Sequence, residues 1–315
     1  MFYAFKKLYR PEYYQHKRSS RYFEGWYFKF VFAGQAWAVI PGISLNPEDA
    51  HAFIQVNRNN GLTSGDPYYT RFDSRAFAWR RDHFQISLGD NRFSLSEVDL
   101  HLEDLRAELR ILNPKRWPAK PFSPNSMGWY AFVQIMQCYH GVIVLDAEVE
   151  GTINGRDLKG GRFYLEKDWG DSFPQAWVWM QSNSFAGPAS LTCSIATVPF
   201  RRRFFTGFII ALYTGDRFYP FTTYNGTRLS GPHFEDNWVS FIAQRGELLL
   251  EVRARRLQGA ELASPVGGEM LGRIQESLDS TISVVLREKG RIVFEDTGAQ
   301  AGLEVVHPER LEIYR

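Results

Sequence analysis

The sequence predicts an all-β protein with little helix, built from two consecutive antiparallel β-barrels or sandwiches. Three observations support this fold class. Aromatic residues make up 16% of the 315 residues, and aromatic side chains are enriched in strands. Short runs of aromatic and β-branched residues alternate with polar residues, which is the period of a strand. Turn-forming pairs then recur at hairpin spacing.

The strand pattern runs through nearly the whole chain. Residues 26–32 and 51–57 show the alternation clearly, and residues 84–112, 142–168, 205–257 and 280–306 read as antiparallel hairpins. The expected turns are Gly89–Asn91, Glu103–Asp104, Asn154–Gly155, Gly215–Asp216, Asn225–Gly226, Arg245–Gly246 and Lys289–Gly290. Only residues 128–137 could form a turn or two of helix, and a strand fits them equally well.

The number of strands predicts two domains. Roughly twenty strands are too many for one small barrel of about eight to ten, and open sheet edges aggregate unless they are closed or covered. We place the boundary at Phe173–Pro174, where an extended strand ends in glycine and proline. The expected domains are therefore residues 1–173 and 174–315.

Charge and cysteine usage exclude several classes of protein. A formal net charge of +2 argues against nucleic acid as a partner. Basic residues interleaved with aromatic ones occur in the arm at residues 1–21 and at Arg201–Arg203. Such mixtures can rest on an anionic membrane surface, but solvated segments are the reading we favour. We expect free thiols at Cys138 and Cys193, and a cytoplasmic protein that could be peripheral to a membrane.

Two segments, residues 22–29 and 160–185, stand apart from ordinary strand sequence because acids and amides follow aromatic stripes. Strand alternation puts these side chains on shared faces. The three sets are Glu24, Trp26, Phe28 and Phe30; Tyr164, Glu166 and Asp168; and Trp177, Trp179, Gln181 and Asn183. An apolar wall with a few polar groups is typical of a ligand pocket. Packed core is the alternative, although a carboxylate there must find a partner or a proton.

These segments resemble a known family. YFEGWYFK at 22–29, MQCYHGV at 136–142, GRFYLEKDWGDSFPQAWVWMQSNSF at 161–185 and GRIQESL at 272–278 are similar to the tocopherol cyclase family, in the family's order. Asp168 stands where plant members tend to carry asparagine. The resemblance implies two consecutive lipocalin-like β-barrels, related to those of carotenoid hydratases.

The resemblance also implies a reaction. Tocopherol cyclases protonate a prenyl double bond and close a chromanol ring when the phenol oxygen captures the tertiary cation. The ligand would be a prenylated aromatic or isoprenoid compound, and no metal or redox cofactor is required. An alkene is a weak base, so the acid must stay protonated in dry surroundings, and tryptophan best faces a cation.

Roles are then expected for particular residues. Asp168 is the expected proton donor, with Glu166 as its alternative or partner. The expected substrate-binding residues are Trp26, Trp169, Trp177 and Trp179 beside the cation, Gln181, Asn183 and Glu276 at the phenol hydroxyls, and Glu24 and His140. A catalytic role for His140 is less favoured than a hydrogen bond in the core.

Other functions remain open at this stage. The same barrels could carry a hydrophobic quinone without chemistry, or an enzyme could hydrate or isomerise the alkene after the same protonation step. Paired carboxylates beside tryptophan also suit a carbohydrate-active site, in which Glu166 or Asp168 would face another acid across an open, wet cleft.

Overall fold

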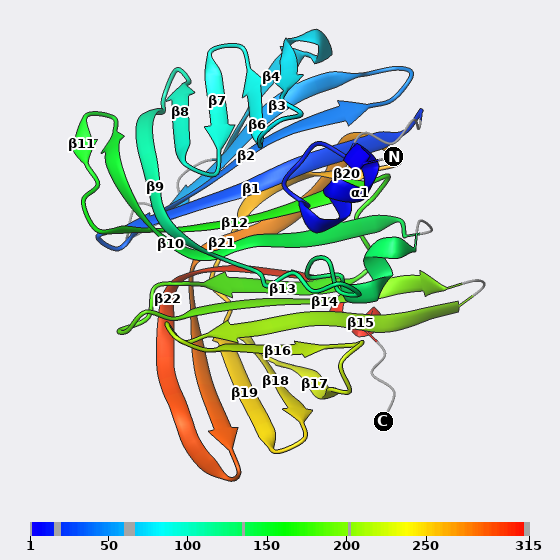
Figure 1. The fold of residues 1–315 in the computed structure, drawn as a ribbon, viewed down its shortest axis with the longest axis vertical. Coiled ribbons are helices and arrows are strands. Elements are labelled where there is room, and N and C mark those ends of the chain that lie inside the picture. The colour runs from blue at the N-terminus through cyan, green and yellow to red at the C-terminus, as the bar shows by residue number, and fades with distance from the viewer. Residues whose placement is uncertain (1, 16–19, 60–66, 134–135, 201–202, 312–315) are drawn as a thin grey trace. The chain divides into compact units, whose positions relative to one another are not determined.

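The computed structural model describes residues 2–15, 20–59, 67–133, 136–200 and 203–311. About two thirds of the described residues are in β-strands, which form two antiparallel sheets (Figure 1). The helical elements among these residues are α1 (Phe2–Tyr9) and three 3₁₀ turns, η1 (Ser74–Ala76), η2 (Gly128–Phe132) and η3 (Pro308–Arg310). The all-β prediction is confirmed. The segment at 128–137 contains the short turn η2, whereas α1 was not predicted.

The first sheet has twelve strands in the order β4-β3-β2-β1-β12-β10-β9-β8-β7-β6-β5, with β11 paired to β10. Its strands are β1 (Tyr22–Phe32), β2 (Gln35–Leu45), β3 (His51–Asn59), β4 (Tyr68–Asp73), β5 (Phe77–Trp79), β6 (Gln85–Leu88), β7 (Asn91–Ser94), β8 (Glu97–His101), β9 (Arg106–Arg116), β10 (Cys138–Ile153), β11 (Arg156–Asp157) and β12 (Gly161–Gly170).

The second sheet has ten strands in the order β16-β15-β14-β13-β22-β21-β19-β18-β17, with β20 paired to β21. Its strands are β13 (Trp177–Ser182), β14 (Ser190–Phe200), β15 (Arg203–Tyr213), β16 (Phe218–Thr222), β17 (Arg228–Glu235), β18 (Trp238–Arg245), β19 (Leu248–Arg255), β20 (Ala260–Val266), β21 (Glu269–Glu288) and β22 (Arg291–Val306).

Both sheets have the same topology. In each, the first strand pairs with the last strand, β1 with β12 and β13 with β22. The two edge strands of each sheet, β4 with β5 and β16 with β17, follow one another in the chain. Each sheet is therefore a meander that returns to its own start, which is the lipocalin-like arrangement expected from the sequence.

The predicted turns all lie at the ends of consecutive strands of these meanders. Asn154 and Gly155, with φ of 49° and 75°, connect β10 to β11. Lys289 and Gly290, with φ of 52° and 77°, connect β21 to β22 in the same way. Two successive positive φ angles make the turn whose twist matches that of the flanking strands.

The chain folds into two compact units. The first consists of residues 1–58, 66–173 and 262–273. The second consists of residues 59–65, 174–261 and 274–315. The segment 262–273, which ends β20 and begins β21, therefore belongs to the first unit although it follows most of the second in sequence.

Aromatic rings pack together in the interior of the first unit. Trp26 stacks on Phe77 and Phe84, with ring centroids 6.0 and 6.3 Å away. Phe28 lies 5.2 Å from Phe93 in the same core. The aromatic stripe of β1 is thus packed core, the alternative that the sequence had left open.

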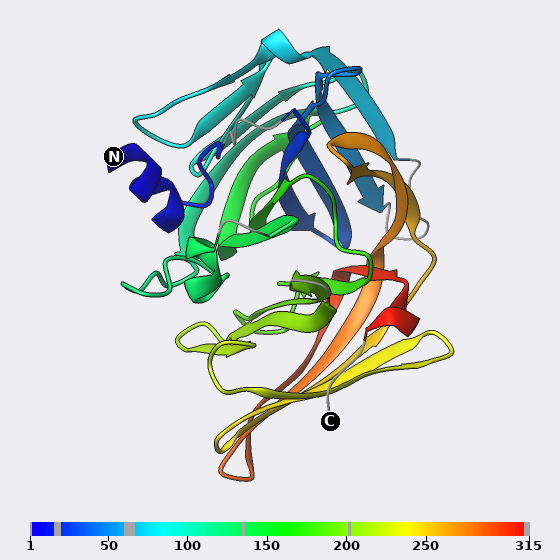
Figure 2. The same ribbon diagram turned by 90° about the vertical axis from the view of Figure 1, so that its right-hand side faces the viewer.

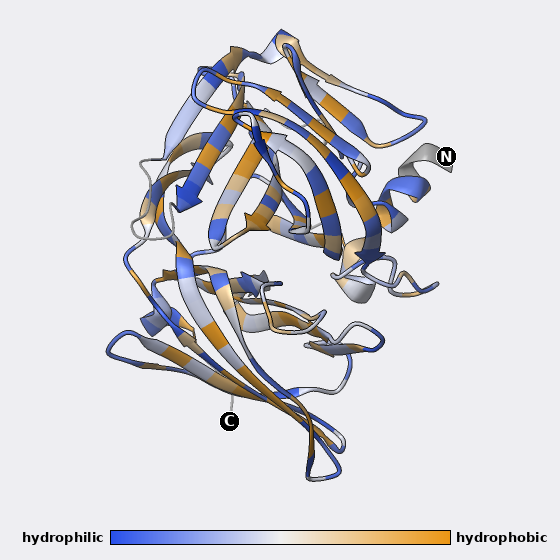
Figure 3. Ribbon diagram, turned by 90° about the vertical axis from the view of Figure 1, so that its left-hand side faces the viewer, coloured by the Kyte–Doolittle hydropathy of each residue, from blue (hydrophilic) through white to orange (hydrophobic). Residues whose placement is uncertain are grey.

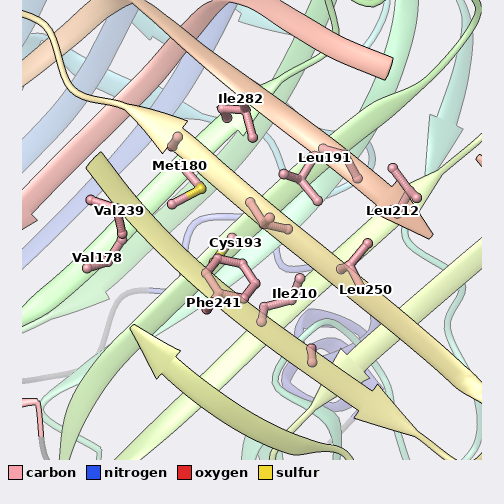
Figure 4. Close-up of a cluster of buried hydrophobic side chains, with 14 of the residues drawn as sticks. Val178, Met180, Leu191, Cys193, Ile210, Leu212, Val239, Phe241, Leu250 and Ile282 are labelled. Carbon is pink, nitrogen blue, oxygen red and sulfur yellow. The ribbon is translucent and has the colours of Figure 1, made fainter. Parts of the chain in front are cut away.

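The interior of the second unit is mostly aliphatic. Figure 4 shows Val178 and Met180 of β13 packed with Cys193, Ile210 and other side chains from neighbouring strands. Hydropathy alternates along many strands of both sheets, as Figure 3 shows, because successive side chains point to opposite faces. Both cysteines are free, as predicted.

Candidate active site

Three strands of the first unit carry its distinctive polar residues on two opposite faces. On β1 and β12, Trp26 pairs with Lys167 and Gly25 pairs with Asp168. On β10 and β12, His140 pairs with Asp168. Residues directly opposite on neighbouring strands share a face. Trp26 and Lys167 therefore lie on the aromatic core side, and His140 and Asp168 lie on the other side.

The face away from the aromatic core brings one imidazole and two carboxyl groups together. His140 Nδ1 lies 3.0 Å from Asp168 Oδ1, and His140 Nε2 lies 3.6 Å from Glu166 Oε2. The Tyr164 hydroxyl donates to Glu166 Oε2 at 2.5 Å. Glu166 and His140 are largely buried, with 4% and 12% of their side chains exposed, whereas Asp168 is 25% exposed. Asp168 is the accessible end of the cluster.

The backbone at His140 is fixed from a separate loop. The Ser126 hydroxyl donates to the His140 carbonyl at 3.1 Å and accepts from the Val142 amide at 2.9 Å. Ser126 is fully buried just before η2. A hydroxyl that both donates to and accepts from one strand holds that strand in place, so the imidazole meets Asp168 with little freedom.

This cluster can hold a proton or a metal ion. One ligand atom each from His140, Glu166 and Asp168 lies within 4.8 Å of the others. Imidazole nitrogen and carboxylate oxygen are ligands that divalent zinc accepts. No metal ligands were expected from the sequence, because these three groups are brought together by strand pairing that local patterns do not reveal. The same three groups can equally pass a proton between two carboxylates through the imidazole.

The aromatic core side holds a second polar cluster around Lys167. Its fully buried ammonium group donates to Glu24 Oε1 at 2.5 Å and to the Tyr13 carbonyl at 2.8 Å. The ammonium nitrogen lies 4.9 Å from the ring centroid of Trp26 and 4.6 Å from that of Trp169. Burial lowers the pKa of Lys167 to about 8, although the Glu24 carboxylate opposes this shift.

This arrangement corrects the role expected of two tryptophans. Trp26 and Trp169 were expected beside a cation generated next to Asp168. They instead face Lys167, because Trp26 pairs directly with Lys167 and neighbouring residues of β12 point to opposite faces. Glu24 likewise binds Lys167, and its carboxylate accepts the Gln15 amide at 2.9 and 3.0 Å.

The N-terminal arm is partly buried against this cluster. Glu12, Tyr13 and Tyr14 are each at most 5% exposed, and the Glu12 carbonyl accepts from the Trp26 indole at 2.7 Å. The expectation of a solvated arm is therefore wrong for residues 11–15, which complete the core of the first unit. Lys17, Arg18, Arg201 and Arg202 lie outside the described residues.

The remaining predicted residues belong to the second unit. Val178 and Met180 point into its apolar core, so Trp177, Trp179 and Gln181 point away from that core, and all three are nevertheless buried. Trp179 pairs with Glu304, and Glu304 pairs with Glu276.

A carboxylate that sequence reasoning missed, Glu304, joins this row. The Trp177 indole donates to Glu304 Oε2 at 2.7 Å. Glu276 is fully buried on the same face, and Asn183 directly follows β13 and is buried as well. Only the register of β13, β22 and β21 reveals the row, because Glu304 is 125 positions from Trp179 in the numbering of the chain.

Two self-closing antiparallel meanders, each with its own core, define a lipocalin-like protein, and the first carries an acid–imidazole cluster on a strand face. The model of the family described as "Tocopherol cyclase-like" matches residues 83–306, and the chain belongs to this family. The matched range includes His140, Glu166 and Asp168. The segment at 22–29 precedes it.

Solved structures share the fold at low sequence identity. Kievitone hydratase from Nectria haematococca is 13% identical, with a TM-score of 0.52 over 89% of this chain and 88% of that one. CghA is 11% identical, with a TM-score of 0.58, and its structure with Sch210972 is 12% identical, with a TM-score of 0.57. Both cover 95% of this chain and 91% of theirs. No curated protein matches the sequence.

Proposed function

We propose that this chain is an acid-catalysed cyclase that protonates a prenyl double bond and closes a chromanol ring by phenol attack on the tertiary cation. The observation that carries the proposal is the contact of two carboxyl groups, Glu166 and Asp168, with a single imidazole, His140. Membership of the tocopherol cyclase-like family supports the same class of chemistry.

In the proposed mechanism Asp168 gives its proton to the less substituted alkene carbon. Asp168 is assigned as the donor because three quarters of its side chain is shielded from water, while the exposed quarter leaves its carboxyl group accessible to a substrate. The electron pair of the double bond forms the new C–H bond and leaves a tertiary cation. The phenol oxygen then bonds to that cation and releases its proton, so the reaction consumes no net proton.

The cluster also provides a route for restoring the donor. Glu166 is nearly buried and accepts a hydrogen bond from the Tyr164 hydroxyl. Its carboxylate lies beside Nε2 of His140, whereas Asp168 lies beside Nδ1. A proton accepted at Glu166 can reach Asp168 through the two nitrogens of His140. His140 thus becomes a working member of the proposed site, a larger role than the sequence analysis favoured.

Hydration of the same alkene is the second candidate. Water can reach Asp168, a quarter of whose side chain is exposed, and water that captures the tertiary cation gives an alcohol. A fold neighbour is named as a hydratase. Analysis of the product from a prenylated hydroquinone distinguishes the two outcomes, because ring closure leaves the mass unchanged and hydration adds one water.

Substitution of the donor tests the proposal. Asp168→Asn keeps the size of the side chain but removes the acidic proton, and we expect a loss of turnover of about 10²–10⁴-fold. The matched control is Asp171→Asn, which changes an exposed acid three positions further along. Product is measured by chromatography, ligand affinity by fluorescence quenching, and folding by circular dichroism.

The outcomes separate the candidate functions. Loss of product in Asp168→Asn with affinity retained, and normal turnover in Asp171→Asn, supports the proposed donor. Full activity of Asp168→Asn would contradict it. Wild-type protein that binds the hydroquinone but never converts it would favour the non-catalytic carrier.

A further inference from the structure

Exposed aromatic side chains of the first unit gather in two segments. Phe5 of α1 is 57% exposed, and Phe122, Trp129 and Phe132 are 85%, 49% and 42% exposed. The last three lie in residues 113–133, which begin with the last four residues of β9 and include η2. We call residues 5–10 together with residues 113–133 the α1–loop surface. Large exposed aromatic groups gathered in this way mark an interaction site.

The two segments lie side by side. The Tyr9 hydroxyl donates to the Pro121 carbonyl at 2.5 Å, and the Asn125 amide donates to the Leu8 carbonyl at 2.8 Å. Figure 2 shows α1 next to the loop that leads to η2, at one side of the first unit. The exposed aromatic residues therefore belong to one region and not to unrelated loops.

The loop that carries these rings is anchored. Pro124 to Gly128 are buried, and Asn125 Oδ1 accepts from the Met127 amide at 2.8 Å. The Trp129 ring stacks on Tyr130 with centroids 4.0 Å apart. The anchored loop thus keeps the Phe122 and Trp129 rings in contact with water. Exposing apolar surface to water costs free energy, and a binding partner that covered the rings would remove this cost.

The charge of the α1–loop surface has one sign. Arg10, Lys115 and Lys120 are exposed, and Lys6 is partly exposed. Residues 5–10 and 113–133 contain no aspartate or glutamate. Glu12 is buried and lies 2.6 Å from Arg116 and 3.6 Å from Arg10. The neighbouring Asp82 is exposed, and its carboxylate contacts Arg80 at 3.7 Å and His83 at 2.9 Å. The surface therefore complements a negatively charged partner.

We propose that the α1–loop surface docks on an anionic lipid bilayer. Aromatic rings prefer the interface between headgroups and acyl chains, and lysine and arginine beside them bind anionic headgroups. The exposed rings are spread over a helix and a loop, and positive charges surround them. A protein interface instead has one continuous apolar core, so this dispersed pattern fits a deformable anionic lipid surface better. The inference rests on this surface alone, and it does not require the proposed chemistry.

Vesicle sedimentation with the 315-residue chain tests the proposal. The two probes are phosphatidylcholine vesicles and vesicles in which a third of the lipid is phosphatidylglycerol. We expect binding to the anionic vesicles at least tenfold tighter than to the neutral ones, and weaker binding in high salt. Phe122→Ser with Trp129→Ser should reduce binding to anionic vesicles at least tenfold, and Lys115→Glu with Lys120→Glu should do the same.

Exposed apolar residues of the second unit provide the matched control. Phe234 and Ile292 are 38% and 48% exposed, so Phe234→Ser with Ile292→Ser removes two exposed apolar side chains elsewhere and should leave vesicle binding unchanged. Equal thermal midpoints for all variants confirm that they are folded.

Several results would overturn the proposal. These are absence of wild-type binding to anionic vesicles, equal loss in the control variant, or full binding in the Phe122→Ser, Trp129→Ser variant. Sedimentation velocity without lipid gives a further check. Self-association that these two substitutions abolish would assign the surface to a second copy of the chain and not to lipid.

Discussion

Lys167 places a positive charge inside the aromatic core of the first unit, between the rings of Trp26 and Trp169. Removing a charge from water is expensive, and a carboxylate partner together with a carbonyl acceptor offsets that cost. Glu24 and the Tyr13 carbonyl are these partners. The side chain therefore ties β12 to β1 and to the N-terminal segment at one point.

We predict that this lysine makes stability depend on pH above neutrality. Its pKa is about 8 in the folded chain, below the ordinary 10.5. Between these values the unfolded chain holds the proton and the folded chain does not, so the lysine's contribution to unfolding free energy rises with pH, by at most about 1.4 kcal/mol per unit. Urea unfolding of the wild type and of Lys167→Met, from pH 7 to 10, measures the difference.

The partner of the lysine provides the control for that prediction. At pH 7, Lys167→Met leaves the Glu24 carboxylate without its buried cation and should cost about 3–5 kcal/mol, whereas Glu24→Gln combined with Lys167→Met should recover part of the loss. If the wild type and Lys167→Met show parallel pH profiles, the lysine does not titrate in this range.

The sequence could predict the face of each side chain on β12 but not its neighbours. Alternation correctly put Glu166 with Asp168 and put Lys167 on the other side. It could not place His140 opposite Asp168, because the pairing of β10 with β12 contains register shifts near residues 142–147 that no local pattern reveals. The candidate acid was thus visible in the sequence, whereas its imidazole partner depended on long-range register.

At the scale of elements, the end of β12 is held tightly against β10. Gly170 has a φ of 155°, and a Cβ atom there would clash with the Gln137 carbonyl oxygen. This close backbone approach closes the strand pair just beyond Asp168 and His140. Only glycine permits two backbones to come so near.

We predict that Gly170→Ala destabilises the protein by about 3 kcal/mol, because the clash is with backbone and the strands must separate. Gly155→Ala is the matched control. Gly155 also has a positive φ, of 75°, but nothing lies within 4 Å of its Cβ position, so the cost should be about 1 kcal/mol of strain. Equal losses in thermal unfolding would show that the Gln137 carbonyl is not the cause.

Elements with local signals could be predicted well. The turns at Asn154–Gly155 and Lys289–Gly290 are specified by residues that accept positive φ, so their neighbours in sequence were sufficient. The helix α1 was missed because it is only eight residues long and its aromatic residues resemble those of the strands. Such short helices are marginal alone and depend on packing, as the hydrogen bond from Asn125 to Leu8 illustrates.

At the scale of the whole molecule, the topology that the two sheets share is not evident in the sequence. The core of the first meander contains a group of packed aromatic rings beside its aliphatic side chains, whereas the core cluster of the second is mostly aliphatic. A common backbone path can be filled by either kind of side chain when the volume suffices. The topology therefore occurs twice although the amino-acid sequence contains no corresponding repeat.

The membership of residues 262–273 in the first unit leads to another prediction. Gln55 Oε1 accepts from the Ala263 amide at 2.8 Å, and the Ser44 hydroxyl donates to the Gly268 carbonyl at 2.6 Å. A fragment of residues 1–173 loses these bonds. We expect it to unfold in less urea than the same fragment followed by a flexible linker and residues 262–273.

The control for this prediction is the same fragment and linker, in which a glycine–serine segment of equal length replaces residues 262–273. Identical urea midpoints for the three fragments would mean that the segment contributes nothing to the first unit.

The pairing of the first strand with the last in each meander has a consequence for synthesis on the ribosome. β1 leaves the exit tunnel long before β12, and residues 262–273 appear only after most of the second meander has been made. During this interval the aromatic-rich strand β1 lacks its partner β12 on one side, and unpaired strand edges promote misfolding and aggregation. Closure of both sheets is non-local and therefore slow, so we expect the nascent chain to depend on chaperones that shield open strand edges.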